Sequence, residues 1–325
     1  MCTSFCTTFG DRYFGRNLDV EYSYGESVVI LPRNCEFTFR KTCSVKNPYA
    51  IMGMAKVVDG VPLFFDAFNE EGLAMAGLAF AGNAEYKPVK HGFDNITPFE
   101  LIPWILLQCK NIDEAKNLLN RINVADISFS KDMPLSPLHF MISDNASSIV
   151  VECVKDGVMV YDNPVEILTN NPPFPMQLFN LNNYMSLSTN PPENHFHKSI
   201  QFDIYSRGMG ALGLPGDLSS QSRFIKAAFT KLNSHISAIN ENTAVSQCFH
   251  ILYSVYQQKG CVCLSEGVYE YTEYSCCCNL TRGIYYYTTY ENSRITAIDM
   301  YNENLDSDRI IEFQLIRNTQ ILEIN

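Results

Sequence analysis

The chain opens with Met1-Cys2-Thr3-Ser4-Phe5-Cys6-Thr7-Thr8, and Gly10-Asp11 separates this segment from Tyr13-Phe14-Gly15. β-Branched and aromatic side chains, which favour strands, are frequent in both segments, and the glycine between them favours a tight turn. We therefore predict two short strands, over residues 2–8 and 13–15, joined at Gly10-Asp11. In this arrangement Cys2 lies at the start of the first strand.

Cys2 is a candidate nucleophile, because a small residue after the initiator methionine allows Met1 to be removed. The new terminus would carry a thiol and an α-amine on one residue, with reference pKa values of roughly 8.5 and 7.7 to 8.0. The amine can then serve as the general base, so that no histidine is needed. From this pattern alone, Cys2 as an ordinary early strand residue stays open as the alternative.

The second segment that could carry chemistry is Gly15-Arg16-Asn17-Leu18-Asp19-Val20-Glu21-Tyr22. Arg16 could stabilise a thiolate, and Asp19 could accept hydrogen bonds from the α-ammonium group. A spacing of three residues in a strand points two side chains to opposite faces, so we expect a turn or bulge at Asn17-Leu18. The alternative is a surface ion pair.

Composition restricts the possible partners. The 325 residues carry a formal net charge of -11, which argues against nucleic acid and against an anionic membrane as partners. An anionic substrate would therefore need local basic residues. Charged residues at positions 11, 12 and 16 interrupt any signal peptide, and the apolar run Leu101 to Leu107 is too short to span a membrane. These features predict a cytoplasmic protein.

The cysteines and histidines do not predict a metal site. Twelve cysteines are present, but neither Cys261-Val262-Cys263 nor Cys276-Cys277-Cys278 has the spacing of a zinc ligand pair. The pair His195 and His197 follows a proline-rich, loop-like stretch, which favours solvent-exposed histidines. We expect reduced, mostly structural cysteines and no metal or cofactor.

The remaining pattern predicts strands, then helices, then strands again, in a layered α+β fold with sheets between helices. No repeat or linker divides the chain, so residues 1–325 are expected to form one domain. We predict strands at 27–31, 63–65, 72–80, 138–143, 148–154, 158–161 and 167–170. Helices are expected at 99–109, from 111 onward, at 222–232 and at 245–256, before a C-terminal meander at 273–278, 283–290, 294–300 and 310–315.

Four segments, taken together and in order, resemble the choloylglycine hydrolase family of N-terminal nucleophile hydrolases. They are Met1-Cys2-Thr3, Gly15 to Tyr22, Leu168-Thr169-Asn170, and Gly216-Asp217 through Ser222-Arg223-Phe224. The similarity runs nearly from end to end and includes Leu138 to Asp144 and Gly283 to Tyr287. It is strongest to the bile salt hydrolases of Gram-positive gut bacteria; the family also contains penicillin V acylases.

The resemblance implies a four-layer αββα sandwich, a mature chain without Met1, and no cofactor. Carried over position by position, it makes Cys2 the nucleophile and Arg16 and Asp19 the pair that holds its thiol and amine. Asn170 matches the amide of the oxyanion hole, and Arg223 matches the basic residue that completes the charge network. Family members are commonly homotetramers.

One position departs from the family pattern. Bile salt hydrolases usually have Asn in a Gly-Leu-Asn-Phe run, whereas this chain has Gly77-Leu78-Ala79-Phe80. The family residue contributes its backbone N–H to the oxyanion hole, which Ala79 retains, so we expect activity to survive. The Asn side chain is lost, which leaves the substrate open, and Asn83 is the one nearby amide that could replace it.

The acyl pocket implied by the resemblance includes Leu18, Phe129 and Met133, the last two in a loop at 126–133. For each of these residues, ordinary core packing is an equal alternative. The function implied is hydrolysis of the amide bond of glycine- or taurine-conjugated bile salts. Hydrolysis of penicillin V or another N-acyl amide, such as an N-acyl homoserine lactone, and an inactive amphiphile-binding relative stay open as alternatives.

Overall fold

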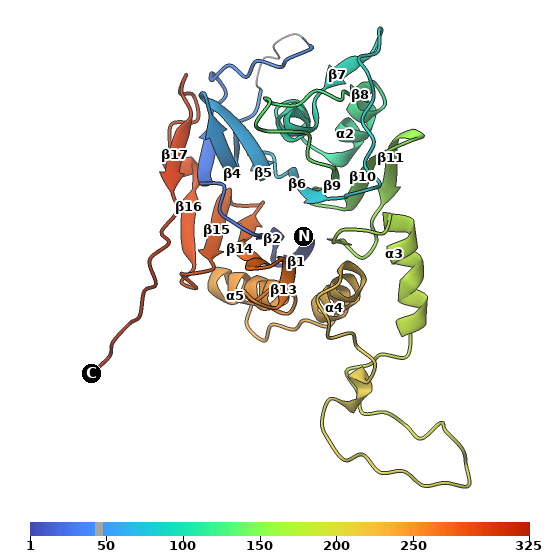
Figure 1. Ribbon diagram of the computed structural model, residues 1–325. Coiled ribbons are helices and arrows are strands. Elements are labelled where there is room, and N and C mark those ends of the chain that lie inside the picture. The colour runs from blue at the N-terminus through green and yellow to red at the C-terminus, as the bar shows by residue number, and fades with distance from the viewer. Residues whose placement is uncertain (43–47) are drawn as a thin grey trace.

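The computed structural model describes residues 1–42 and 48–325, and its long strands form two antiparallel sheets (Figure 1). The first sheet has the order β12-β1-β2-β14-β15-β16, with β13 paired to β14. Its strands are β1 (Cys2–Phe9), β2 (Asp11–Val20), β12 (Ile167–Leu168), β13 (Val262–Ser265), β14 (Val268–Asn279), β15 (Ile284–Thr289) and β16 (Thr296–Asp299). The candidate nucleophile therefore lies at the start of the second strand from one edge of this sheet, β1, which pairs with β12 and β2.

The second sheet has the order β11-β10-β9-β6-β5-β4-β3-β17. Its strands are β3 (Ser27–Leu31), β4 (Ile51–Val58), β5 (Val61–Asn69), β6 (Ala74–Ala79), β9 (Leu138–Ser143), β10 (Ser148–Val154), β11 (Gly157–Asp162) and β17 (Ile311–Gln314). A small parallel pair, β7 (Asp94–Ile96) and β8 (Ile122–Val124), accompanies it. Strands β1 and β6 contact each other across the two sheets.

Helices cover the outer face of each sheet. α4 (Ser220–Leu232) and α5 (Glu241–Tyr253) lie on the first sheet, against β1 and β12 and against β2 and β14. α1 (Leu101–Leu106) lies on β5 and β6, and α1 and α2 (Ile112–Leu119) share an apolar cluster with the second sheet. The layers run helix, sheet, sheet, helix (Figure 1), which confirms the predicted four-layer αββα sandwich.

Local signals explain most helix boundaries. Asn111 caps α2 by accepting a hydrogen bond from the Glu114 N–H, as its sequence predicts. A helical segment does begin near the predicted residue 99, but it opens with a 3-10 helix, Pro98–Glu100, which is followed by the short α1. The helix predicted over 99–109 is therefore confirmed as an α-helix over Leu101–Leu106, and its predicted end at Cys109 is wrong. Helices α4 and α5 begin a few residues before the predicted positions, and α5 ends before residue 256.

The predicted strands at 27–31, 138–143 and 148–154 are confirmed to the residue. β2, β5 and β14 are longer than predicted, because polar side chains inside them find partners in the fold rather than ending the strand. Five elements were not predicted: β4, β7, β8, β13 and α3 (Phe174–Asn180). The remaining short 3-10 helices are Leu181–Tyr184, Met209–Ala211 and Met300–Asn302.

The expected bulge at Asn17-Leu18 is wrong. β2 pairs with β1 in unbroken register from Cys2↔Leu18 to Phe9↔Asp11. The register shift lies instead in the partner strand β14, between Thr272 and Tyr274. Arg16 and Asp19 therefore point to opposite faces of the sheet, as an odd spacing in a regular strand requires.

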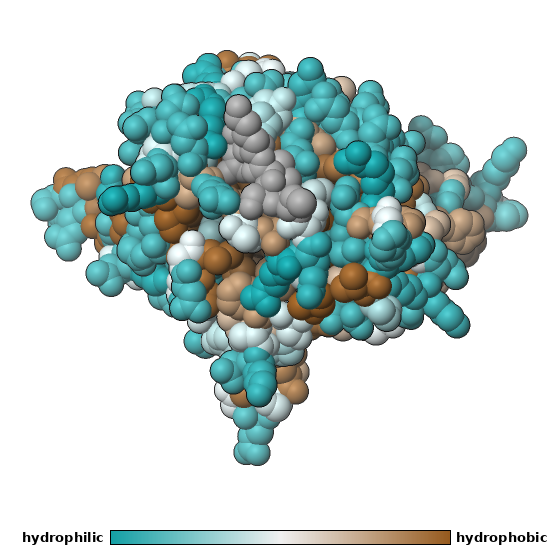
Figure 2. All heavy atoms as spheres, turned by 90° about the horizontal axis from the view of Figure 1, so that it is seen from above, coloured by the Kyte–Doolittle hydropathy of each residue, from teal (hydrophilic) through white to brown (hydrophobic). Residues whose placement is uncertain are grey.

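The face of the molecule seen in Figure 2 is mostly hydrophilic, with smaller hydrophobic patches between the polar residues. Among the described residues, no helix is long and apolar enough to cross a membrane.

Candidate active site

Cys2 lies under Met1 at the start of β1, where its side chain is only 4% exposed. Met1 extends the ladder by one residue: its ammonium donates to the Asp19 carbonyl at 2.7 Å, and its carbonyl accepts the Asp19 N–H at 3.0 Å. The ammonium also forms an ion pair with Glu270 at 2.8 Å. The nitrogen of Cys2 is an amide in this chain and donates to Asn170 Oδ1 at 2.9 Å.

Arg16 contacts the Cys2 sulfur directly. Its Nη2 lies 3.0 Å from Sγ, and its Nη1 donates to the Phe65 carbonyl at 2.6 Å. The guanidinium is fully buried between the two sheets. Burial lowers the pKa of Arg16, but Tyr274, Cys2 and Asp66 oppose this effect, and the net result is a pKa above the ordinary value. Arg16 is thus a fixed cation that can stabilise a thiolate.

Asp66 of β5 is the counter-ion of Arg16, and sequence reasoning missed it. Its Oδ2 lies 3.6 Å from Arg16 Nη1, and it accepts hydrogen bonds from Tyr274 at 2.5 Å and Tyr285 at 2.8 Å. The carboxylate is 1% exposed. A single acid within the apolar run Leu63 to Phe68 was the available signal, because a buried charge needs a partner.

Arg223 approaches Cys2 from the opposite side, from helix α4. Its Nη1 donates to the Cys2 carbonyl and to Thr3 Oγ1, both at 2.6 Å, and its Nη2 donates to Asn170 Oδ1 at 2.6 Å. Burial lowers the pKa of Arg223, although Asp19, Cys2 and Glu270 act in the other direction. Arg223 therefore fixes both the Cys2 backbone and the Asn170 side chain.

Asp19 points toward the helix layer that carries Arg223. Its Oδ2 lies 3.9 Å from Arg223 Nη1. Its carboxylate accepts from Thr272 Oγ1 at 2.7 Å and from Gln257 Nε2 at 3.3 Å. Burial raises its pKa, against the lowering effect of Arg223. With Met1 present, the Cys2 nitrogen donates to Asn170, so contact of Asp19 with a Cys2 amine stays a prediction.

The two predicted oxyanion-hole residues lie side by side. Asn170 Nδ2 donates to the Ala79 carbonyl at 2.8 Å. The N–H and C=O of one strand residue point to the same side, so the Ala79 N–H also points toward Asn170. The neighbouring Phe80 N–H bonds to Pro137 on the β9 side, as this alternation requires. Asn170 keeps a second Nδ2 hydrogen for another acceptor.

A cavity of about 360 Å³ opens beside Cys2. It is mostly apolar, and the three residues predicted for the acyl pocket, Leu18, Phe129 and Met133, all lie on its wall together with Ala79. Phe129 stacks edge-on against Phe99 at 5.1 Å. The polar side chains on the wall are Asp19, Glu21, Tyr24, Lys56, Ser136 and Glu270. Lys56 is the cation among them, and it makes no ion pair with any described residue.

Asn83 does not line this cavity. It lies on a separate open depression beside Asn171 and Pro172, so the structure does not support it as a replacement for the missing Asn side chain. A larger cavity of about 590 Å³ lies near Lys87 and Lys155, away from Cys2.

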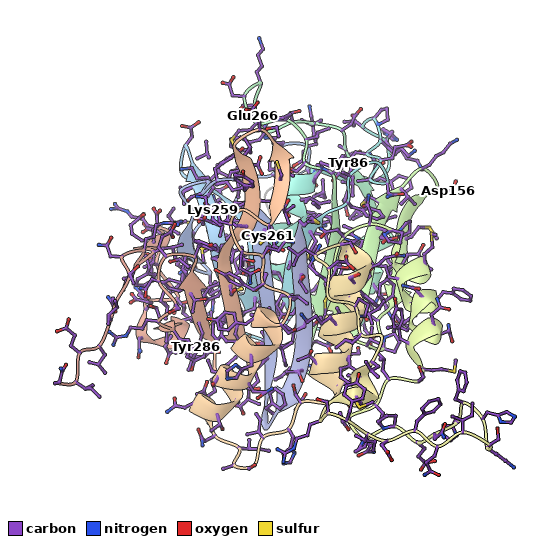
Figure 3. The ribbon with its side chains drawn as sticks, turned by 60° about the horizontal axis from the view of Figure 1, so that its bottom comes forward. Tyr86, Asp156, Lys259, Cys261, Glu266 and Tyr286 are labelled. Atoms are coloured by element: carbon purple, nitrogen blue, oxygen red, sulfur yellow. The ribbon has the colours of Figure 1, made fainter. Side chains whose placement is uncertain are left out.

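Among the residues that the structure describes, the other cysteines and histidines do not form a candidate metal site. Cys261 and Cys263 are exposed, whereas Cys276 to Cys278 are buried in β14. Figure 3 shows Cys261 near the base of the hairpin whose tip carries Glu266. His195 and His197 are exposed, as expected for solvent-exposed histidines. Within residues 1–42 and 48–325, no group of three His, Cys, Asp or Glu side chains could hold a metal ion.

Comparison with known proteins extends the description. Residues 2–313 match the model of the linear amide C–N hydrolases, choloylglycine hydrolase family. A bile salt hydrolase/transferase of Lactiplantibacillus plantarum is 51% identical over 325 residues, which are 100% of both chains. A crystal structure of a conjugated bile acid hydrolase variant from Clostridium perfringens has a TM-score of 0.93 at 35% identity and covers 100% of both chains. A penicillin V acylase from Agrobacterium tumefaciens, 18% identical, has a TM-score of 0.75 over 98% of this chain and 94% of its own, which is a likeness of fold alone.

Proposed function

The chain belongs to the choloylglycine hydrolase family of linear amide C–N hydrolases, and we propose that it hydrolyses the amide bond of glycine- or taurine-conjugated bile salts. One observation carries the proposal: Cys2 Sγ lies 3.0 Å from the buried Arg16 Nη2 and opens onto a mostly apolar cavity. A cysteine held next to a buried cation is poised to react as a thiolate.

The reaction requires that Met1 is removed, so that the Cys2 nitrogen becomes an amine. The amine accepts the thiol proton, and Sγ attacks the substrate carbonyl to form a tetrahedral intermediate. The second Nδ2 hydrogen of Asn170 and the Ala79 N–H stabilise the oxyanion, while Arg223 holds Asn170 in place. Asp19 lies on the helix side of the sheet, where its carboxylate can accept a hydrogen bond from the resulting ammonium, and Arg223 lies 3.9 Å from that carboxylate.

Collapse of the intermediate breaks the C–N bond. The ammonium of Cys2 gives its proton to the leaving amine, glycine or taurine, and the acyl group stays on Sγ as a thioester. Water then attacks the thioester, with the amine again acting as base, and releases the bile acid. No step requires a group beyond these side chains and water.

The cavity favours an amphiphilic acyl group. Leu18, Phe129 and Met133 offer apolar surface to a steroid, and Phe99 and Ile102 extend that surface. A conjugated bile salt also carries an anionic carboxylate or sulfonate. Lys56 supplies the local positive charge that such a substrate needs in a chain with a net charge of -11.

Substitution of the nucleophile tests the proposal. Cys2→Ser should lower the hydrolysis of glycocholate and taurocholate by orders of magnitude and leave the fold intact, because serine has little thiolate character. Cys6→Ala is the matched control: burial raises the pKa of the Cys6 thiol to about 12, so this thiol is inert. Wild-type rates in Cys2→Ser would overturn the mechanism.

Two further measurements separate the remaining alternatives. Intact-mass analysis of the purified enzyme should show a chain without Met1; an active chain that keeps Met1 would contradict the role of the free amine. Penicillin V assayed beside the bile salts should react more slowly than both, and a faster reaction would replace the proposed substrate.

Acyl transfer is a second candidate activity, because the relative from Lactiplantibacillus plantarum is named a hydrolase/transferase. The thioester on Cys2 could be attacked by an amine in place of water, which forms a new amide and leaves the thiol free. Incubation with glycocholate and an excess of a second amino acid should yield a new conjugate, and its absence would limit the enzyme to hydrolysis.

We also propose that the chain forms a homotetramer, as the family resemblance implies. Large hydrophobic side chains are exposed in the segment 185–212, which projects from the body of the molecule between α3 and α4 (Figure 1). Met185, Phe196 and Tyr205 in this projecting segment are each about 80% exposed. Exposed apolar groups of this density favour burial against another chain. The cytoplasmic location stays a prediction.

A further inference from the structure

We propose that His139 is a positioning residue that fixes the two oxyanion-hole donors, Asn170 and Ala79, relative to each other. Glu152 holds the ring of His139 in place. This inference rests on the proposed amide hydrolysis at Cys2, since it assigns Asn170 and Ala79 as the oxyanion donors. It concerns a buried histidine that takes no part in the acyl-transfer steps.

His139 lies in the middle of the second sheet and is fully buried. Strand β9 places it directly opposite Leu78 of β6 on one side and Glu152 of β10 on the other. Both the ring and the Glu152 carboxylate, which is 1% exposed, are shielded from water. A polar pair is costly at such a place unless each member is hydrogen-bonded.

The ring contacts the residue beside each proposed donor. Its Nε2 lies 2.9 Å from the Thr169 carbonyl, and Thr169 directly precedes Asn170. Its face stacks on Phe80, with the ring centres 4.3 Å apart and the planes 5° from parallel. Phe80 directly follows Ala79, so one rigid ring links the Asn170 segment to the Ala79 segment.

The hydrogen bonds fix the orientation of the ring. A carbonyl oxygen has no hydrogen to give, so Nε2 must donate to Thr169. Nδ1 faces Glu152 Oε1 at 3.3 Å, and the same oxygen accepts the Phe174 N–H at 2.8 Å. Glu152 therefore ties His139 to the start of α3 through one oxygen, which accepts from the Phe174 N–H and lies against Nδ1. The ring cannot turn over without losing a partner.

Asn170 needs this support because it follows a strand of only two residues, β12. The Thr169–Asn170 peptide group is held from both sides: its N–H donates to Ser220 Oγ at 2.8 Å, and its carbonyl oxygen accepts from His139. Oxyanion donors must lie about 2.7 to 3.1 Å from the developing charge, and a displacement of about 1 Å can cost roughly 100-fold in rate. Because the His139 ring sets the distance between the Asn170 and Ala79 donors, it affects catalysis without touching the substrate.

Variants of His139 test the proposal, because two reactions of Cys2 can be compared: amide hydrolysis, which forms an oxyanion, and alkylation, which does not. His139→Leu introduces an apolar side chain of similar volume and removes both polar contacts of the ring, whereas His139→Gln retains a nitrogen donor for the Thr169 carbonyl. We expect kcat for glycocholate to fall roughly 100-fold in His139→Leu and about 10-fold in His139→Gln, with KM nearly unchanged. Alkylation of Cys2 by iodoacetamide, which forms no oxyanion, should proceed at the wild-type rate in both.

A third variant and a control keep the test decisive. Phe80→Leu removes the stacked ring but no hydrogen bond, so it should lower kcat by a smaller factor and would still inform if His139→Leu failed to fold. His250→Gln, an exposed histidine on α5, should behave as the wild type. Unchanged kcat in His139→Gln and Phe80→Leu, or a parallel loss of alkylation and hydrolysis, would overturn the positioning role. A wild-type enzyme that does not cleave conjugated bile salts would instead refute the proposed function.

Discussion

The charged residues around Cys2 are buried far more deeply than charged residues usually are. Arg16, Asp19, Asp66 and Arg223 are each no more than 1% exposed, and each finds an oppositely charged or hydrogen-bonding partner. The two arginines act from different layers. Arg16 reaches Sγ from between the sheets, whereas Arg223 reaches the Cys2 carbonyl from the helix side. The thiol and the backbone of the nucleophile are thus fixed independently.

Removal of the Asp66 charge should destabilise the protein strongly. Asp66→Asn leaves Arg16 buried without a counter-ion, and we expect a loss of about 3 to 5 kcal/mol in the free energy of unfolding. Tyr274→Phe removes one hydrogen bond to the same carboxylate and should cost about 1 to 3 kcal/mol. Urea unfolding followed by circular dichroism measures both. Equal stability of Asp66→Asn and the wild type would show that the pair contributes nothing.

Lys56 should affect substrate binding more than the chemical step. Lys56→Gln removes the cation from the cavity wall, and we expect KM for glycocholate and taurocholate to rise roughly 2- to 5-fold, the range for a partly exposed ion pair. The kcat should change little, and added salt should weaken the effect because it screens the interaction. An uncharged amide of the same steroid provides the control. An equal rise in KM for that amide would assign Lys56 to packing rather than charge.

At the scale of the elements, the sequence predicts what depends on neighbouring residues. β3, β9 and β10 are recognisable because each is an apolar run that ends at polar or turn residues. The sequence predicts that β5 ends at Phe65, because an acidic residue such as Asp66 is typical of a strand end. The tyrosines that donate hydrogen bonds to Asp66, Tyr274 and Tyr285, lie about two hundred residues further along the chain. The local sequence pattern carries no information about them.

For the candidate site too, the sequence predicts some residues and not others. Cys2, Arg16, Asp19, Asn170 and Arg223 could be named because they match a family pattern, not because their spacing defines a site. The residues that hold them could not be named. Thr272 and Gln257 hold Asp19, and both belong to distant segments. The face on which Asp19 lies follows from the regular pairing of β2 with β1, and the sequence of β2 alone does not reveal that this pairing has no bulge at Asn17-Leu18.

A second buried cluster joins three elements and predicts a pH-dependent stability. Glu166, before β12, pairs with Arg12 of β2 and with Lys231 of α4, the latter at 2.8 Å. Burial raises the pKa of the Glu166 carboxyl, but Arg12 and Lys231 outweigh it and lower the pKa below its ordinary value of 4.5. A lowered folded-state pKa means that the stabilisation is complete above pH 4.5 and is lost as the pH falls through the folded-state value.

Glu166→Gln should therefore lower the free energy of unfolding by about 2 kcal/mol at pH 7, less than for a fully buried pair because the site is partly exposed. The difference from the wild type should shrink as the pH falls below about 4.5. Thermal unfolding at pH 7, 5 and 3.5 measures this trend. A difference that stays constant over this range would show that the charge of Glu166 is not what stabilises the cluster.

For the whole molecule, the four layers contribute differently to substrate binding and to catalysis. The second sheet, α1 and the loop before β9 supply most of the cavity wall, to which β2 adds Leu18, whereas the first sheet and α4 supply the nucleophile and Arg223. The cavity therefore opens where the two sheets meet, and substrate preference can change through the cavity wall without disturbing the residues around Sγ. The projecting segment 185–212 lies outside both sheets, and neither substrate binding nor catalysis explains its exposed apolar side chains (Figure 1).

The projecting segment predicts an oligomer that depends on its apolar side chains. Phe196 and Phe202 stack edge-on at 5.7 Å, and Tyr205 is 80% exposed nearby in the sequence. Light scattering should give the wild type a mass of about four times 36.8 kDa. Replacement of Phe196, Phe202 and Tyr205 together by serine should yield a smaller species, because these side chains no longer gain from burial in an interface. Leu264→Ser, at an exposed position of β13, should keep the wild-type mass. A tetramer that persists in the triple variant would place the interface elsewhere, and a monomeric wild type would refute the proposed assembly.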